Sequence, residues 1–300
     1  MRTLTPVYDP PAEAKRPATE SPPVPPRRDV RRRFRADKSA VLASALLALL
    51  LGCALFAPMF SPYTGDINFD HRFMVPSWEH PFGTDDLGRD VFLRVMEGGR
   101  ISLAAGLIAM LCAMTIGVII GSLSGYYGGF VDSILMRFVD LFLSVPAFFL
   151  ILFLASVLTP GLILICTLIA ATQWMEVARL VRSVVLGVKQ HDFVDAARAL
   201  GASDNRILFR HILSHTGRPL IVAATIGVAQ AIMTESAISF LGFGVQPPAA
   251  SWGSMLTHAQ SYLGSAPWLA IFPGVMIFLT VLSCYALGDH LRTFFGTGPR

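Results

Sequence analysis

Six apolar runs, each about long enough to cross a lipid bilayer, constrain the fold of this chain more than any other feature. A helix needs about 20 apolar residues to make such a crossing. The first run, residues 39–60, has 22 residues and no charge. The other five are residues 101–123, 138–158, 161–177, 220–241 and 268–287. The runs predict an all-α membrane protein with six transmembrane helices.

Composition excludes an ordinary soluble domain, because 53% of the residues are hydrophobic, only 15% are charged and the mean hydropathy is +0.58. The four cysteines lie far apart, and each falls in an apolar run. This spacing suggests neither a disulfide framework nor a CxxC metal site. We interpret Cys53, Cys112, Cys166 and Cys284 as small core residues.

Prolines and glycines indicate where the helices bend or turn. Pro146 and Pro273 fall inside spans and predict kinks. Pro160 and Gly161 predict a tight hairpin between the third and fourth spans. The turn from the second span into the third is assigned to Gly125, Gly128 and Gly129.

The distribution of basic residues predicts the orientation. Residues 1–38 contain eight prolines and ten Lys or Arg, which predicts a disordered cytoplasmic tail attracted to anionic lipid, with no nucleic-acid partner. With the N-terminus inside, twenty of the 24 basic residues lie on the inner side. Residues 61–100 then form an extracytoplasmic loop, and residues 293–300 a second cytoplasmic tail.

A polar segment, residues 190–214, interrupts the apolar runs on the predicted cytoplasmic side. Asp192 is a predicted N-cap, Asp195 occupies the place of a capping-box acid, and Gly201 is expected to end the helix in a left-handed conformation. A second helix is expected to begin at Ser203.

One face of this short helix is apolar, because Phe193, Val194, Ala197 and Leu200 follow helical spacing. A helix of about three turns is marginal alone and needs a surface to pack on. Periodicity leaves open whether that surface is its own protein, the lipid headgroups or a partner.

The same segment resembles the EAA loop of bacterial ABC importer permeases through Asp195, Ala196, Ala197 and Gly201, followed by residues 210–213 (RHIL). In that family the loop forms a coupling helix that sits in a cleft of a cytoplasmic ATPase subunit. Asp195 replaces the usual Glu. Ser214 stands where the family usually has Pro, and the next proline is Pro219. The resemblance implies that the ATPase-coupling residues are Phe193, Asp195, Ala196, Ala197, Leu200 and Gly201.

Further blocks match in order at residues 80–90, 125–132, 136–140, 239–253 and 272–280. The first block also suggests an ordered, hydrogen-bonded turn followed by a short helix. Together these blocks closely resemble C-type inner-membrane subunits of the dipeptide, oligopeptide and nickel permease family, over about residues 66–292. The resemblance implies a type I ABC importer permease fold in the bacterial cytoplasmic membrane. Its core would be residues 101–292, with five transmembrane helices and the coupling loop.

The resemblance also implies function and partners. The chain would form part of a pathway for dipeptides or oligopeptides, together with a B-type permease subunit. Two cytoplasmic ABC ATPase subunits and an extracytoplasmic solute-binding protein would complete the importer. Nickel or another small solute is an alternative cargo.

Glu235 is the charged residue deepest in a predicted span, and the sequence leaves two roles for it open. Its carboxylate would either line the passage and meet a peptide ammonium group, or bond neighbouring helix ends or snorkel outward.

Other polar residues near the spans are assigned structural roles. Arg137 and Asp140, three residues apart, predict an ion pair within one helix. Gln173, Trp174 and Glu176 are interpreted in the same way, with the tryptophan marking an interface.

Missing motifs argue against an enzyme. The chain has three lysines and no GxxxxGK[ST] motif, so it would bind no cofactor, and ATP would be bound by partner subunits. His211 and His215 lack a third ligand, so no metal site is predicted. A self-sufficient channel or secondary transporter remains the competing class, and it predicts transport by this chain alone.

Overall fold

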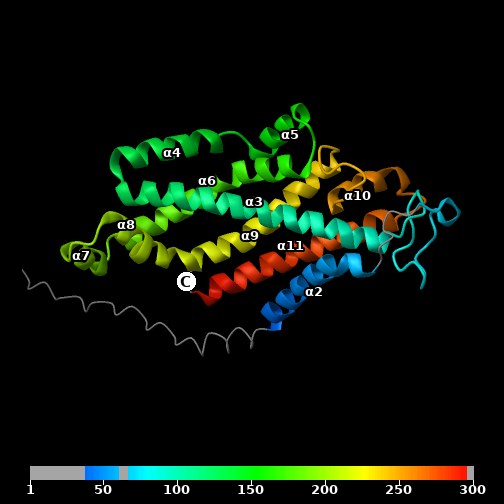
Figure 1. Cartoon of the computed structure of the whole chain (residues 1–300), viewed down its shortest axis with the longest axis horizontal. Coiled ribbons are helices and arrows are strands. Elements are labelled where there is room, and N and C mark those ends of the chain that lie inside the picture. The colour runs from blue at the N-terminus through cyan, green and yellow to red at the C-terminus, as the bar shows by residue number, and fades with distance from the viewer. Residues whose placement is uncertain (1–37, 61–66, 296–300) are drawn as a thin grey trace, which may run out of the picture.

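Long helices lying roughly side by side make up most of the chain (Figure 1). This computed structural model describes residues 38–60 and 67–295. Within them, five helices are long and apolar enough to cross a membrane. They are α2 (Lys38–Phe60), α3 (Val91–Tyr127), α6 (Leu162–Val188), the stretch Asp204–Phe240 that includes α9 (Leu213–Phe240), and α11 (Trp268–Phe294).

The third predicted span, residues 138–158, is broken in the structure. Helices α4 (Gly129–Leu143) and α5 (Ala147–Val157) meet at an angle of 74°. The bend predicted at Pro146 is confirmed, because this residue is the N-cap of α5 and has no amide hydrogen with which to continue α4. At Pro273, in contrast, α11 continues as one helix.

The start of α4 differs from the prediction of residue 138. Gly128 and Gly129 have φ angles of +67° and +50°, which side chains disfavour, and they turn the chain directly after α3. The polar side chains of α4 hid this early start from hydropathy. Gly125, which was assigned to the same turn, lies inside α3 instead.

Gly125 belongs to a glycine seam on α3, formed with Gly117 and Gly121. A Cβ atom at Gly117 would lie 2.6 Å from Val177 Cβ, and one at Gly125 would lie 2.9 Å from Val185 Cβ. Small residues at this four-residue spacing allow helix backbones in membranes to approach closely. The seam therefore brings α3 and α6 into direct contact over two turns.

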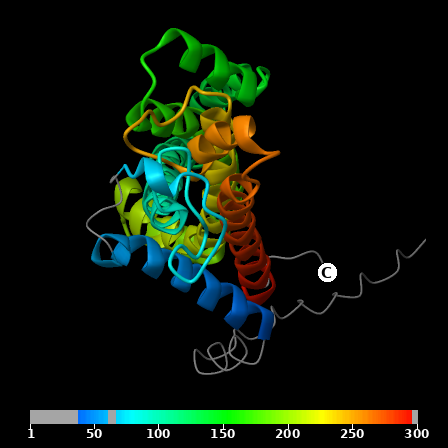
Figure 2. The same cartoon turned by 90° about the vertical axis from the view of Figure 1, so that its right-hand side faces the viewer.

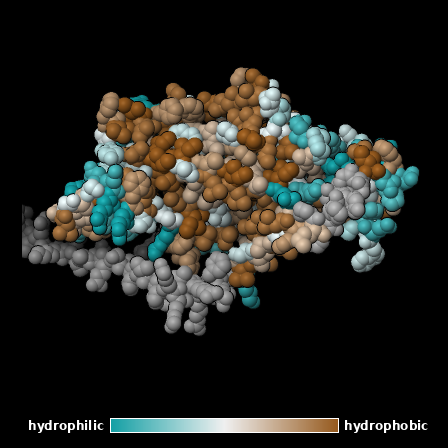
Figure 3. All heavy atoms as spheres, in the orientation of Figure 1, coloured by the Kyte–Doolittle hydropathy of each residue, from teal (hydrophilic) through white to brown (hydrophobic). Residues whose placement is uncertain are grey.

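An end-on view shows how the other helices surround this pair (Figure 2). Helices α4 and α5 lie on the side of the molecule opposite α2, while α11 packs against both α2 and α9. The molecular surface is apolar across the middle and hydrophilic at both ends (Figure 3). This banding is the surface expected of a multi-pass membrane protein.

Residues 80–90 of the predicted outer loop form an ordered, hydrogen-bonded turn, as the sequence indicated. Asp85 Oδ1 accepts hydrogen bonds from the amides of Leu87 and Arg89, each at 2.9 Å. Asp90 caps α3 by accepting from the Leu93 amide at 3.1 Å. The helix that follows is the long α3 itself.

Short elements fill the two ends of the bundle. At the end that carries the predicted extracytoplasmic loop, named the outer end after that prediction, lie η1 (Phe69–His71), α10 (Trp252–Ala259) and η3 (Gln260–Tyr262); the opposite end is named the inner end. At the other end lie α7 (Asp192–Ala199), α8 (Asp204–Arg206) and the π-helix η2 (Ile207–Ile212). The predicted tails fall outside the described residues, except that residue 38 begins α2 and residues 293–295 end α11.

Candidate functional site

Helix α7 projects beyond the inner ends of the long helices (Figure 1). Its N-cap position is held by His191, and no side chain caps it, so the capping predicted for Asp192 and Asp195 is wrong. Asp192 is already in the first turn, where its charge still favours the helix dipole. Asp195 pairs with Arg198 at 3.2 Å. Gly201 ends the helix at a φ of +78°, as predicted.

The apolar face predicted for α7 divides into two. Val194 is fully buried against Ile207, Leu208 and Ile212, and Ala197 packs on the same cluster. Leu200, however, is 88% exposed and Phe193 is 38% exposed. The helix therefore anchors itself with one pair of apolar residues and presents the other pair to its surroundings.

The polar edge of α7 is open as well. The side chains of Asp195 and Ala196 are exposed, and so is Gly201. Phe193 stacks between two histidine rings, with centroids 5.7 Å from His191 and 5.2 Å from His215. The six ATPase-coupling residues predicted from the sequence thus lie on α7 or directly after it, although Ala197 is partly covered.

Polar contacts fix α7 and the segment after it to the transmembrane helices. The hydroxyl of Tyr126, at the inner end of α3, donates to Asp204 Oδ1 at 2.6 Å. Lys189, at the end of α6, donates to the Tyr126 carbonyl. Beyond η2, α9 runs unbroken through Ser214 and Pro219, so no break replaces the one expected of a proline at Ser214. Displacement of α7 must therefore displace the ends of α3, α6 and α9.

Glu235 is fully buried near the outer end of α9, where it joins three helices. Its carboxylate accepts hydrogen bonds from Ser239 at 2.7 Å and from Ser102 of α3 at 3.1 Å. Ser102 in turn accepts a bond from the Trp252 amide of α10 at 3.1 Å. This geometry supports bonding between helices, and it leaves Glu235 no exposed surface on a passage.

We expect Glu235→Ala and Glu235→Gln to behave differently. The alanine variant leaves the Ser102 and Ser239 hydroxyls without their acceptor and opens a cavity, which should cost about 2–4 kcal/mol of stability. The glutamine variant keeps the shape and an acceptor oxygen, so its uptake should stay close to wild type. Thermal melting of the purified protein and uptake assays check both; loss of uptake in a stably folded Glu235→Gln variant would return Glu235 to the passage.

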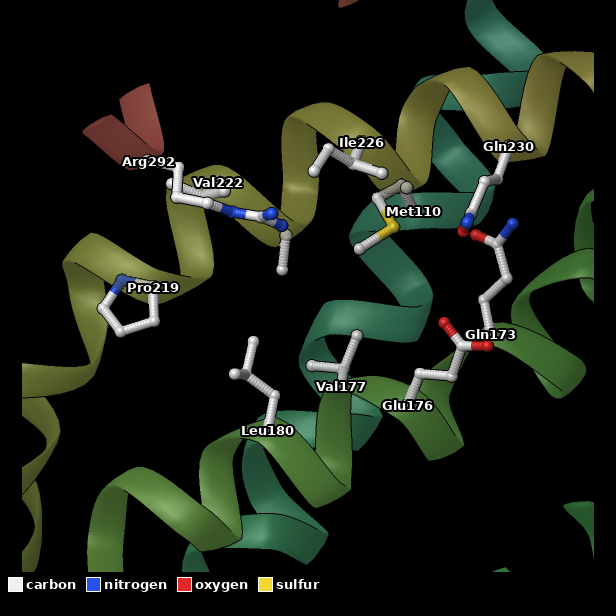
Figure 4. Close-up of a pocket in the computed structure, with 12 residues that line it drawn as sticks. Met110, Gln173, Glu176, Val177, Leu180, Pro219, Val222, Ile226, Gln230 and Arg292 are labelled. Carbon is white, nitrogen blue, oxygen red and sulfur yellow. The ribbon is translucent and has the colours of Figure 1, made fainter. Parts of the chain in front are cut away.

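A cavity of about 380 Å³ lies between α6 and α9 (Figure 4). Its wall is mostly apolar and includes Met110 of α3. Four polar side chains interrupt it: Gln173 and Glu176 of α6, Gln230 of α9 and Arg292 of α11. The list of apolar lining residues is completed by Val177, Leu180, Pro219, Val222, Ala223, Ile226 and Gly227.

Three of these polar side chains, Gln173, Glu176 and Gln230, gather at one end of the cavity. Gln173 and Gln230 point toward each other in Figure 4, and Glu176 follows Gln173 by one helical turn. Gln173 Oε1 is buried without a hydrogen-bond partner. Arg292 of α11 lines the other end, near Pro219 and Val222. The structural role predicted for Gln173 and Glu176 therefore misses that both line one cavity. Trp174, which was predicted to mark an interface, is instead buried in the bundle.

The ion pair predicted between Arg137 and Asp140 is wrong. Asp140 bonds Arg179 of α6 at 2.5 Å instead. A second pair, Asp132 with Arg182, has oxygen–nitrogen distances of 2.5 and 2.6 Å. Both pairs join α4 to α6, because the neighbouring helix offers guanidinium groups at the depth of the α4 carboxylates.

Comparison with known proteins gives two family matches. Residues 117–295 match the family described as binding-protein-dependent transport system inner membrane component. Residues 25–76 match the N-terminal transmembrane domain of oligopeptide transport permease C. The first match covers more than half of the chain.

Curated relatives match over nearly the whole length. The glutathione transport system permease protein GsiD of Escherichia coli O6:K15:H31 is 42% identical over 263 residues, 87% of each chain. The protein of the same name from Shigella boydii serotype 4 has the same identity and coverage. A putative peptide permease protein of Brucella suis biovar 1 is 42% identical over 266 residues, 88% of each chain.

Proposed function

Because this chain belongs to the family of binding-protein-dependent transport system inner membrane components, we propose that α7 is the surface through which an ATPase drives it. The chain is a permease subunit of an ATP-driven ABC importer of the peptide family, and it is a multi-pass protein of the inner membrane. Short peptides, glutathione-like compounds among them, are the proposed cargo.

The observation that carries the assignment of α7 is the division of its apolar residues between a buried pair and an exposed pair. Val194 is buried in the protein's own core, while Leu200 offers almost its whole side chain to a partner. Phe193 and Leu200 are exposed together on a short polar element, and we take this apolar pair with its polar rim as an interaction site. We propose Phe193, Asp195, Ala196, Ala197, Leu200 and Gly201 as the contacts for a cytoplasmic ATPase.

The complete importer follows from the family. Partner permease, ATPase and solute-binding protein belong to such systems in general. For this chain we propose one B-type permease subunit and two ATPase subunits, with the binding protein on the ordered outer loop. Both termini and α7 lie in the cytoplasm in this arrangement, as the excess of basic residues on that side favours.

Transport would proceed by movement of the tied helices. Closure of the ATPases would push on α7, and the Tyr126–Asp204 bond and the Val194 cluster would pass that motion to α3, α6 and α9. Reversing a 99:1 preference between two states takes about 5.5 kcal/mol. A loosely attached α7 would bend under the push of the ATPases, whereas a firmly attached one moves the transmembrane helices with it.

Reconstitution tests the proposed function. Proteoliposomes holding the full complex should take up peptide only with ATP and with the ATPase subunits present. Cargo entering vesicles that hold this chain alone, driven by an ion gradient, would instead establish a self-sufficient transporter.

Cysteine labelling tests the orientation. In a cysteine-free background, Ala196→Cys should react with a membrane-impermeant maleimide only from the cytoplasmic side, because the side chain of Ala196 is exposed on α7. Glu79→Cys, in the exposed outer loop, is the matched control and should react only from outside. The reverse pattern would place α7 beyond the reach of any cytoplasmic ATPase.

A further inference from the structure

Glu176 lies at a depth in the membrane where a charged side chain is energetically costly. It lies 14 residues after Leu162 in α6, or about 21 Å along the helix axis. Gln230 lies 17 residues after Leu213 in α9, about 26 Å from that end. Both positions are near the middle of the membrane, where ionisable side chains face a bundle interior or a water-filled cavity and mark a pathway.

The carboxylate of Glu176 is exposed and borders the cavity. Within residues 38–60 and 67–295 no hydrogen bond or ion pair is recorded for it, whereas Asp132, Asp140 and Glu235 all have partners. Its negative charge is therefore available to a cation that enters the cavity.

The two glutamines add a different chemistry beside it. A glutamine amide donates and accepts, as a peptide group does, so it matches a peptide backbone whatever the side chains are. Gln173 Oε1 is buried at this cavity without any donor. The apolar wall formed by Met110 and Ile226 suits side chains of varied shape.

We propose that this cavity holds the N-terminal end of a short peptide in transit, with Glu176 receiving its α-ammonium group and Gln173 and Gln230 bonding its backbone amides. The inference rests on the proposed function, since transit requires the assembled importer. The cavity volume of about 380 Å³ lies in the range usual for small-molecule sites. Arg292 gives the opposite, cytoplasmic end a positive charge, so the two ends of the cavity differ in sign as the two ends of a peptide do.

A test must separate recognition of the peptide N-terminus from a contact between subunits. The full complex, with its partner permease, ATPases and binding protein, is placed in proteoliposomes and given a casein hydrolysate of dipeptides and tripeptides supplemented with glutathione. Half of the pool is N-acetylated, which removes the ammonium charge. Mass spectrometry then gives the ratio of free to acetylated uptake for each peptide.

Glu176→Gln should lower that ratio about 10- to 100-fold, the range expected for a hydrogen bond between charged groups. Because wild type and variant share one binding protein, a change in the ratio belongs to the permease. Glu176→Asp should retain most of the preference. Glu79→Gln, which removes a carboxylate from the exposed outer loop, should leave the ratio unchanged.

ATP hydrolysis stimulated by the loaded binding protein is measured in parallel as the readout of coupling, and the control Glu79→Gln should leave it near wild type. An unchanged ratio, an equal loss of both peptide forms, or a complex that no longer assembles would overturn the inference, the last by making Glu176 a contact to another subunit. Import of no peptide by a wild-type complex with coupled ATP hydrolysis would overturn it too. Failure of the proposed function looks different, because wild-type uptake would then not depend on ATP.

Discussion

Replacing Leu200 with aspartate should abolish ATP-dependent uptake while leaving the permease folded and inserted. Leu200 is 88% exposed, so the substitution removes little packing within the chain. Docking surfaces, in contrast, depend on a few apolar anchors whose truncation costs at least about 2 kcal/mol, and a buried charge costs more. We expect the ATPase to bind about 100- to 1,000-fold more weakly, corresponding to about 3–4 kcal/mol.

The measurement pairs uptake with co-purification of the ATPase, and thermal melting of the permease serves as the folding readout. Leu263→Asp is the matched control, because Leu263 is also an exposed leucine (55%) but lies at the outer end of the molecule. It should leave ATPase binding intact. Normal ATPase binding by Leu200→Asp would remove α7 as the docking element.

The second large effect is expected from Gly121→Leu, which should prevent α3 and α6 from packing. A Cβ atom at Gly121 would overlap the Ala178 carbonyl oxygen, and it would lie 2.8 Å from Val181 Cβ. Backbone atoms do not yield as a flexible side chain does, so the helices must separate. Overpacking a tight core costs about 1–3 kcal/mol; a leucine against backbone should reach at least the upper end and leave little folded protein.

Fluorescence-detected size-exclusion chromatography after heating measures this loss. Gly274→Leu provides the control, because Gly274 also lies in a transmembrane helix, α11, but a Cβ atom there would have no heavy atom within 4 Å. That variant should melt close to wild type. Equal melting temperatures for Gly121→Leu and the wild type would show that the seam does not hold the two helices together.

Hydropathy predicted most of the fold because the bilayer requires long apolar helices, and five of the six spans appear near the expected residues. Hydropathy missed the start of α4, because Asp132, Arg137 and Asp140 interrupt the apolar pattern there. The two carboxylates, Asp132 and Asp140, are tolerated because α6 supplies an arginine to each of them. Such pairing between helices is invisible in one helix's own sequence.

The candidate sites show the same limit. Spacing located the short helix and its end at Gly201, but it did not separate the anchoring Val194 from the exposed Leu200, since both fit one apolar stripe. In the membrane, hydropathy predicted the depth of Glu235 without the direction it faces, and it placed Glu176 only at the end of a span. The packing of neighbouring helices decides that direction, and it buries the first and opens the second.

The glycine seam couples α3 and α6 mechanically, because it packs them in direct contact. Helix α6 leads directly into α7 at the inner end, and α3 begins at the ordered turn of Asp85 and Asp90 at the other, about 55 Å away for 37 residues. Because the valines of α6 pack directly on the α3 backbone at the seam, the two helices are expected to tilt together. Free-energy coupling between two sites is reciprocal, so in the proposed importer a binding protein docked on the outer turn would alter the free energy of ATPase binding at α7, and the ATPase would alter that of docking by the same amount.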